Sequence, residues 1–158
     1  MPDVARLAVL VGLQASGKST FFARHLAPTH LHVSKDHWPN GRRKEARQRR
    51  VVAEALAEGR SVAVDNTNPS VEERAALVGL ARAAGVPVVA YWFPPDLDAS
   101  LRRNAERTGR ARVPDVGLFA TAKRLEPPTR EEGFDALHVV TFDGTGGFTV
   151  TPPDVTGP

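Results

Sequence analysis

Short apolar runs alternate along the chain with longer stretches of helical composition. Leu7 to Val11 is apolar at every position, as expected of a strand that is buried on both faces. Four further strands are predicted, at residues 30–34, 61–65, 87–93 and 137–142. The strand at residues 61–65 ends with a carboxylate, Asp65.

Helical composition fills the gaps between the predicted strands. Ser70 and Glu73 have the spacing of a capping box and open a predicted helix that runs to Gly85, and Asp115 is a candidate cap for another that reaches Leu125. The other helices are predicted from a glycine-containing loop at residues 12–20 to about residue 26, and over residues 43–57 and 97–107.

Strands that alternate with helices predict an α/β fold. We expect a single domain at residues 1–150, with a mostly parallel central sheet flanked by helices, and a flexible proline-rich tail at residues 151–158. Ligands of such sheets bind beyond the carboxyl ends of the strands. The loops that should converge there are residues 12–20, 34–40, 65–70 and 103–113.

The composition limits the class of protein. The 158 residues suit one domain, and no run of about 18 apolar residues is present that could span a membrane. We see no signal-peptide cleavage site and no cysteine, so we expect a protein of the reducing cytoplasm. Of the 21 basic residues 17 are arginines, which favours a polyanionic ligand, although a GC-rich genome would give the same excess.

Residues 12–19 match the phosphate-loop pattern G-x-x-x-x-G-K-[ST] in full, after a predicted strand and before a helix. The glycines let the backbone curl so that N–H groups point at phosphate oxygens. Lys18 is expected to reach the β- and γ-phosphates, and the Ser19 hydroxyl to bind Mg²⁺. The sequence therefore predicts binding of ATP and Mg²⁺ by Gly12, Gln14, Ala15, Ser16, Gly17, Lys18, Ser19 and Thr20.

The loop alone does not identify the reaction. A GTPase would normally carry a guanine-reading N-K-x-D motif, which is absent, and the chain is too short for a motor ATPase with its sensor elements. A small kinase remains.

A kinase needs a group that accepts the proton of the attacking hydroxyl. Asp36 and Asp65 each follow a predicted strand, so we expect a base and a metal-shell partner. The alternative for each is an ordinary loop aspartate that caps a turn. After Asp65, the side chains of Asn66, Thr67 and Asn68 could line a polar substrate pocket.

Arginines cluster in two places. Around Thr108 and Gly109 they would form a lid that neutralises charge during transfer, or else a solvated helix face; these residues are Arg102, Arg103, Arg107, Arg110 and Arg112. At the start of the second helix, Arg43, Arg47 and Arg50 have the spacing of one helix face and could follow a phosphate backbone, or else lie far from any ligand.

Two weaker signals lie near Asp36. His30 and His32 alternate onto one strand face as a metal pair would, but no third ligand is nearby, so we interpret them as strand residues. Trp38 could stack on an acceptor base or simply pack.

An ordered set of motifs resembles the polynucleotide 5′-hydroxyl kinases, meaning the phage enzyme and, more closely, the kinase domain of the animal polynucleotide kinase/phosphatase. The resemblance covers about residues 7–142. Its most specific parts, besides the phosphate loop, are residues 65–69, Arg103-Asn104 with Arg107, Val113-Pro114, and residues 126–134.

The resemblance implies roles for single residues. Asp36 would activate the 5′-hydroxyl of a DNA or RNA acceptor, and Asp65 would support the metal through water. Arg107 would act on the transferring phosphate and Arg103 on the nucleotide. Lys35, which stands where the family commonly has arginine, would contact the acceptor together with Asn66, Thr67, Asn68, Arg43 and Arg47.

The sequence also departs from the family. Pro39 stands at the spacing where the phage enzyme has an acceptor-binding arginine, and no D-x-D-x-T phosphatase motif is present, so we expect a kinase only. Two alternatives therefore stay open: a P-loop kinase of a small-molecule alcohol (a sugar, antibiotic or metabolite), and a nucleotide-dependent switch.

Overall fold

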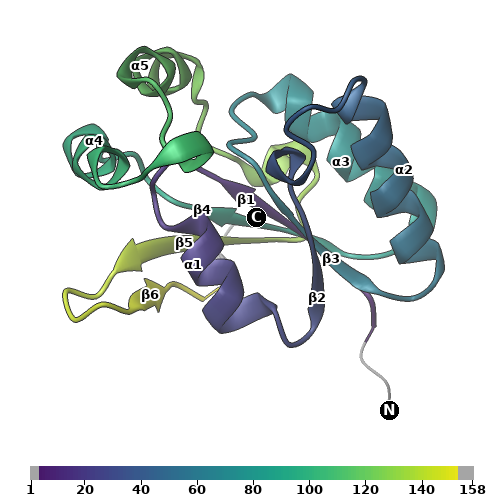
Figure 1. The fold of residues 1–158 in the computed structure, drawn as a ribbon. Coiled ribbons are helices and arrows are strands. Elements are labelled where there is room, and N and C mark those ends of the chain that lie inside the picture. Colours follow the sequence, from purple (N-terminus) through teal and green to yellow (C-terminus); the bar gives the residue numbers. More distant parts are fainter. Residues whose placement is uncertain (1–3, 153–158) are drawn as a thin grey trace.

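The five predicted strands lie side by side in one sheet in the computed structural model, which describes residues 4–152 (Figure 1). The strand order is β2-β3-β1-β4-β5-β6; β1 to β5 are parallel, and β6 runs antiparallel to β5. The predicted α/β fold with a mostly parallel sheet is confirmed. The strands are β1 Leu7–Val11, β2 His30–Val33, β3 Ser61–Asp65, β4 Val88–Trp92, β5 Ala136–Phe142 and β6 Phe148–Val150.

Helices connect these strands, and short turns extend several of them. Within residues 4–152, no helix combines the length and the apolar character that a membrane crossing requires. The α-helices are α1 Lys18–Phe21, α2 Lys44–Ala57, α3 Val71–Ala84, α4 Leu97–Ala105 and α5 Asp115–Arg124. A π-helical turn, Phe22–Leu26, continues α1, and 3-10 turns lie at Lys35–His37, Gly109–Ala111 and Arg130–Glu132.

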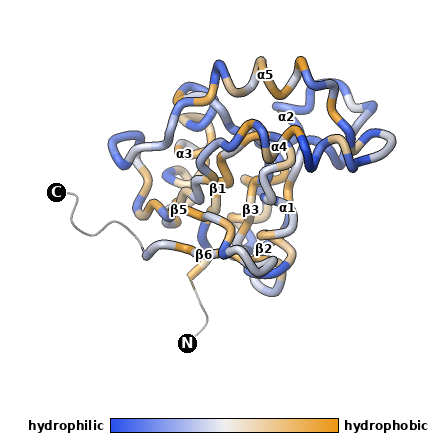
Figure 2. The backbone as a smooth tube through the Cα atoms, turned by 90° about the vertical axis from the view of Figure 1, so that its left-hand side faces the viewer, coloured by the Kyte–Doolittle hydropathy of each residue, from blue (hydrophilic) through white to orange (hydrophobic). Residues whose placement is uncertain are grey.

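β1 is the centre of the fold, and all five of its residues are fully buried. Leu7, Val9 and Val11 face α2 and α3, where they pack with Val52 and Leu77. The alternate residues of β1 face α1 and its π-helical extension on the other side of the sheet. The central strands form the apolar interior of the molecule (Figure 2). A strand buried on both faces explains why the run is apolar at every position.

The sheet brings the predicted loops together at its carboxyl edge. Leu10 of β1 pairs with Asp65 of β3, and the Gly12 N–H donates to the Thr67 carbonyl over 3.1 Å. The phosphate loop therefore lies directly beside the polar segment that follows β3.

Several local predictions need correction. β6 was missed because three residues after a glycine-rich turn carry too short a pattern. Of the predicted capping box, the Ser70 hydroxyl does accept from the Glu73 N–H, whereas the Glu73 carboxylate forms an ion pair with Arg124. Asp115 is the first residue of α5 rather than its cap.

Residue 151, the first of the predicted flexible tail, is attached to the sheet. The Thr151 N–H donates to the Val139 carbonyl over 3.0 Å, which attaches residue 151 to β5. Residues 153–158 of that tail lie outside the described part of the chain.

A buried ion pair attaches the late segment to the site. Arg74 of α3 is fully buried; its guanidinium donates to both carboxylate oxygens of Glu132, over 2.8 and 3.0 Å, and to the Asn68 carbonyl over 2.9 Å. Each of the three guanidinium nitrogens thus donates to a fixed acceptor. The pair therefore joins α3 and the segment around Glu132 to the backbone of the loop after β3.

We predict that Glu132→Ala lowers the free energy of unfolding by about 3–5 kcal/mol, because it leaves the Arg74 charge buried without its partner. Thermal and denaturant unfolding measure this. The matched control is Arg124→Gln, which breaks an exposed pair with Glu73 and should cost about 1 kcal/mol or less. Equal losses in the two variants would contradict this interpretation of the buried pair.

Candidate active site

The phosphate loop folds tightly between β1 and α1. Gly17 has a φ of 96° and Ala15 a φ of 58°, both in the left-handed region. A Cβ atom at Gly12 would lie 2.9 Å from the Phe93 Cβ, and one at Gly17 would lie 2.9 Å from the Phe142 Cζ. Glycine is needed at both ends of the loop, because neighbouring side chains fill the space that a methyl group would occupy.

Lys18 lies buried inside this loop, with 8% of its surface exposed. Its ammonium donates to the carbonyls of Gly12 (3.0 Å) and Leu13 (2.6 Å) and approaches the Ser16 hydroxyl at 3.4 Å. Burial lowers the pKa of Lys18 to about 8, although the negative charge of Asp65 partly opposes this shift. The lysine is thus a buried cation without a formal counter-charge in direct contact, and a phosphate would stabilise it.

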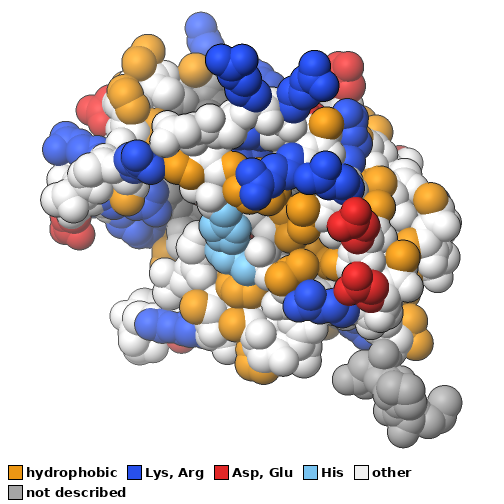
Figure 3. Space-filling view, turned by 45° about the vertical axis from the view of Figure 1, so that its right-hand side comes forward, with side chains coloured by type: hydrophobic (Ala, Val, Ile, Leu, Met, Phe, Trp, Pro, Cys, Tyr) orange, Lys and Arg blue, Asp and Glu red, His pale blue; other side chains and the backbone are white. Residues whose placement is uncertain are grey.

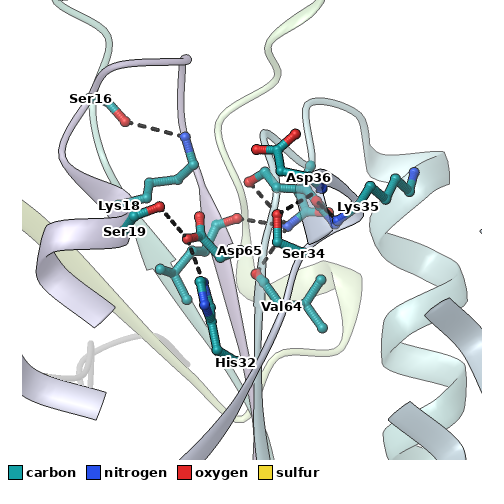
Figure 4. Close-up of polar contacts among 12 residues, drawn as sticks. Ser16, Lys18, Ser19, His32, Ser34, Lys35, Asp36, Val64 and Asp65 are labelled. Atoms are coloured by element: carbon teal, nitrogen blue, oxygen red, sulfur yellow. Dashed lines mark hydrogen bonds and ion pairs between the residues drawn. The ribbon is translucent and has the colours of Figure 1, made fainter. Parts of the chain in front are cut away.

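Asp65 at the end of β3 collects the donors around it. Its Oδ2 accepts from the Ser19 hydroxyl over 2.7 Å and from the His32 Nε2 over 2.9 Å (Figure 4). Burial raises the pKa of Asp65, but the hydrogen bonds from His32 and Ser19 and the charge of Lys18 outweigh it, so that the pKa is lowered. Asp65 is therefore a carboxylate at neutral pH, beside the hydroxyl predicted to bind Mg²⁺.

Sequence reasoning missed His32 as a site residue. Its ring stacks on Phe22 at 4.1 Å and lies edge-on to His37 at 4.9 Å, so packing fixes the ring as it points at Asp65. The signal was present in the alternation of His30 and His32, but we rejected a metal pair and interpreted both as strand residues. The strand order, with β2 beside β3, reveals the partner.

Asp36 is exposed on the 3-10 turn that follows β2. Its backbone N–H donates to the Ser34 hydroxyl over 3.2 Å, which caps the turn. Figure 4 places Asp65 between Asp36 and Lys18, and the Asp36 charge contributes to the pKa of Lys18 by raising it. An exposed carboxylate thus faces the phosphate loop, and a substrate can reach it. Lys35, beside it, forms an ion pair with Glu45.

Asn66 joins three segments of the site. Its Oδ1 accepts from the Lys35 N–H over 2.9 Å, and its Nδ2 donates to the Gln48 Oε1 over 2.7 Å. Gln48 lies on α2 and is 98% buried, with 2% of its surface exposed. The turn that carries Asp36 is therefore attached to both β3 and α2.

Asn68 corrects the expectation of a substrate-lining amide. It is buried, and its Nδ2 donates to the Leu10 carbonyl over 2.7 Å. Its backbone has a φ of 45°. The side chain supplies the hydrogen bond that the Leu10 carbonyl accepts near the end of β1. We therefore assign Asn68 to the structure of the loop rather than to substrate binding.

The predicted lid lies over the phosphate loop. Arg103 of α4 donates to the Ala15 carbonyl over 2.8 Å, and its guanidinium carbon lies 4.2 Å from the centre of the Phe142 ring. A cavity of about 250 Å³ opens beside this pair, between Ser16, Asp96 and Phe148. The lid and β5–β6 thus enclose a slot next to the phosphate loop.

The second predicted lid residue approaches the loop from the same side. Arg107 donates to the Ala111 carbonyl over 3.2 Å, and its charge lowers the pKa of Lys18 further. Gln14 of the phosphate loop donates to the Thr121 hydroxyl of α5 over 2.9 Å. The lid helices therefore contact the loop directly.

The basic residues of α2 lie differently from the prediction of one helix face. Arg43 precedes the helix in a left-handed conformation, with a φ of 53°, so it does not continue the face of Arg47 and Arg50. The Arg47 guanidinium carbon lies 4.4 Å from the centre of the Trp38 ring.

Hard cations prefer oxygen ligands, and the Ser19 hydroxyl with the Asp65 carboxylate offers such a pair. The described residues contain no group of three or more His, Asp or Glu side chains that could hold a metal ion. A cation at Ser19 would therefore take most of its ligands from water and phosphate, as Mg²⁺ usually does in proteins.

A profile of the AAA domain family matches residues 7–128 of this chain. The bifunctional polynucleotide phosphatase/kinase of Schizosaccharomyces pombe is 26% identical over 140 residues, which cover 86% of this chain and 33% of that protein. A protein of Acanthamoeba polyphaga mimivirus, to which the same two activities are assigned, is 29% identical over 148 residues, covering 89% of this chain and 34% of that protein. The chain thus spans about a third of the length of these curated relatives.

Among solved structures, a fungal RNA kinase superposes with a TM-score of 0.68 at 15% identity. The match covers 90% of this chain and 78% of that one. At this identity the likeness concerns the fold.

We predict that ATP binding draws a proton onto Lys18 near pH 8. With a pKa of about 8, roughly half of the free protein carries the neutral amine at that pH, and phosphate charge should restore the ammonium. Calorimetry in buffers of different ionisation enthalpy, with magnesium present, should find uptake of about 0.5 proton at pH 8 and about 0.1 at pH 7. Lys18→Met is the control, and the same uptake in that variant would contradict the assignment.

Proposed function

The chain belongs to the AAA domain family, and from this premise we propose that it is an ATP-dependent kinase that transfers the γ-phosphate to the 5′-hydroxyl end of a nucleic acid. One observation carries the proposal: the exposed carboxylate of Asp36 lies across Asp65 from the phosphate-loop residues Lys18, which is buried, and Ser19. A carboxylate held opposite a phosphate site is what an acceptor hydroxyl needs.

The donor half binds the triphosphate. The N–H groups of residues 12–17 and the start of α1 would surround the phosphates, and the Lys18 ammonium would turn from the loop carbonyls to phosphate oxygens. Mg²⁺ at Ser19, and at Asp65 through water, would neutralise charge on those oxygens. The slot between Arg103, Phe142 and Phe148 would take the nucleoside.

The acceptor half supplies the base. Asp36 would accept the proton of the 5′-hydroxyl as its oxygen forms a bond to the γ-phosphorus and the bond to the β-phosphate oxygen breaks. Asn66 accepts a hydrogen bond from the backbone of the turn, so that the Asp36 carboxylate keeps its place while one acceptor replaces another. Arg107, close enough to affect Lys18, would stabilise the charge of the transferring group.

Two observations favour a polymer acceptor over a small alcohol. Exposed arginines follow Asp36 in the chain at residues 42–50, and Lys and Arg side chains gather on the face that carries α2, as a polyanion would need (Figure 3). The curated relatives that cover most of this chain are named as polynucleotide phosphatase/kinases. The Asp36 position argues against a switch, which needs no acceptor base. Since the chain spans about a third of those relatives, only the kinase half of their two activities is proposed here.

We predict transfer of label from γ-labelled ATP to 5′-hydroxyl oligonucleotides in a panel that also contains nucleosides, sugars and other small alcohols. Asp36→Asn should reduce the transfer rate by roughly 10²-fold or more while the dissociation constant for ATP stays within about twofold, because Asp36 acts only on the acceptor. Preferred transfer to a small alcohol would show that the acceptor is a small molecule rather than a nucleic acid. An Asp36→Asn protein that loses ATP binding but keeps its turnover would move Asp36 to the donor side.

A further inference from the structure

A strong positive charge lies beside Asp36 that the donor site does not use. The segment from Lys35 to Arg50 carries seven basic and two acidic residues, a net charge of +5, whereas the whole chain carries +3. The remainder of the chain is thus net negative. Figure 3, which brings the α2 side forward, shows Lys and Arg side chains gathered above the histidines. This concentration predicts a polyanionic partner for the α2 side of the site.

An aromatic ring lies within this charge. Trp38 follows Asp36 by two residues and is half-buried, since part of its ring packs against the core. The exposed Arg47 of α2 lies over the ring, with its guanidinium carbon 4.4 Å from the ring centre. An aromatic plane combined with a cation is the means by which proteins bind unpaired nucleotides, through base stacking and a phosphate contact.

The backbone around Trp38 is held in place before any ligand binds, and the ring itself packs against the core and beneath Arg47. The Gly41 N–H donates to the Trp38 carbonyl over 2.9 Å, and a Cβ at residue 41 would lie only 3.1 Å from the Trp38 Cβ. The preceding turn is attached to β3 through Asn66. A preplaced ring loses little conformational freedom on binding, which favours stacking.

We propose that Trp38 and Arg47 form a binding site for a nucleobase and an adjacent phosphate of an unpaired 5′ end. The inference rests on the proposed function and specifies its acceptor. A base of the acceptor stacks on Trp38. The Arg47 guanidinium leaves its place over the ring and binds a backbone phosphate of the acceptor. Because pairing and stacking restrain the bases of a duplex and leave only the outer face of the terminal pair exposed, we expect the site to favour single-stranded or overhanging 5′ ends over blunt duplex ends.

The two tryptophans of the chain allow a direct test, because Trp92→Phe leaves Trp38 as the sole tryptophan. Titration of this variant with a single-stranded 5′-hydroxyl oligonucleotide should quench the Trp38 fluorescence, with half-saturation near the KM of the same strand for transfer. The same strand in a blunt duplex should give little quenching. Equal quenching by both, or none by either at concentrations that saturate transfer, would overturn the inference.

Kinetics give an independent readout. Trp38→Leu should lower kcat/KM for the single strand by roughly tenfold or more, mainly through KM, and leave the KM for ATP unchanged. Trp38→Phe, which keeps an aromatic face, should restore most of it. Arg47→Gln should reduce the slope of log affinity against log salt by about 0.7. The control is Arg49→Gln, an exposed arginine of the same helix, for which a smaller change is expected.

The outcomes separate this inference from the proposed function. If oligonucleotides are phosphorylated while Trp38→Leu and Arg47→Gln behave as the parent, the nucleobase site is wrong and the kinase stands. If no 5′-hydroxyl oligonucleotide is phosphorylated or bound, the proposed function fails and this site fails with it.

Discussion

The hydrogen bond from the Ser19 hydroxyl to Asp65 is the contact on which the rest of the site depends, because it joins the phosphate loop to β3. The same carboxylate oxygen accepts from His32, which extends the connection to β2. Asn66, the next residue, then holds the turn that carries the candidate base. One buried carboxylate therefore determines how the donor half and the acceptor half lie relative to each other. Its charge also partly compensates for the burial of Lys18.

The surrounding fold bears the energetic cost of this arrangement. The non-glycine residues of the described chain that adopt a positive φ are Ala15, Arg43 and Asn68, and they lie in the phosphate loop, before α2 and after β3. Such conformations cost about 1–3 kcal/mol each and persist only where the surroundings determine them. The buried Arg74 carbonyl contact at Asn68 is one such constraint. Strain gathered at one edge of an otherwise regular sheet is typical of a functional site.

The sequence predicted the parts of this protein that depend on local pattern. The apolar run of β1 and the glycine and lysine spacing of the phosphate loop are written in consecutive residues, and the fold they predict is the one observed. The partners of His32 and Asn66 could not be predicted, because their contacts join residues that only the strand order and the packing of α2 bring together. Asn68 was misjudged for the same reason: a polar residue in a loop suggests solvent or substrate, whereas its acceptor is the end of a neighbouring strand.

In the proposed reaction, a triphosphate held by Lys18 and Ser19 faces an acceptor hydroxyl at Asp36. The most direct measurement is the position of the label after transfer from γ-labelled ATP to a 5′-hydroxyl oligonucleotide that is then digested to 5′-mononucleotides. We predict that the label appears in the mononucleotide of the 5′ end. Label found only in inorganic phosphate, or at any other position of the strand, would contradict it.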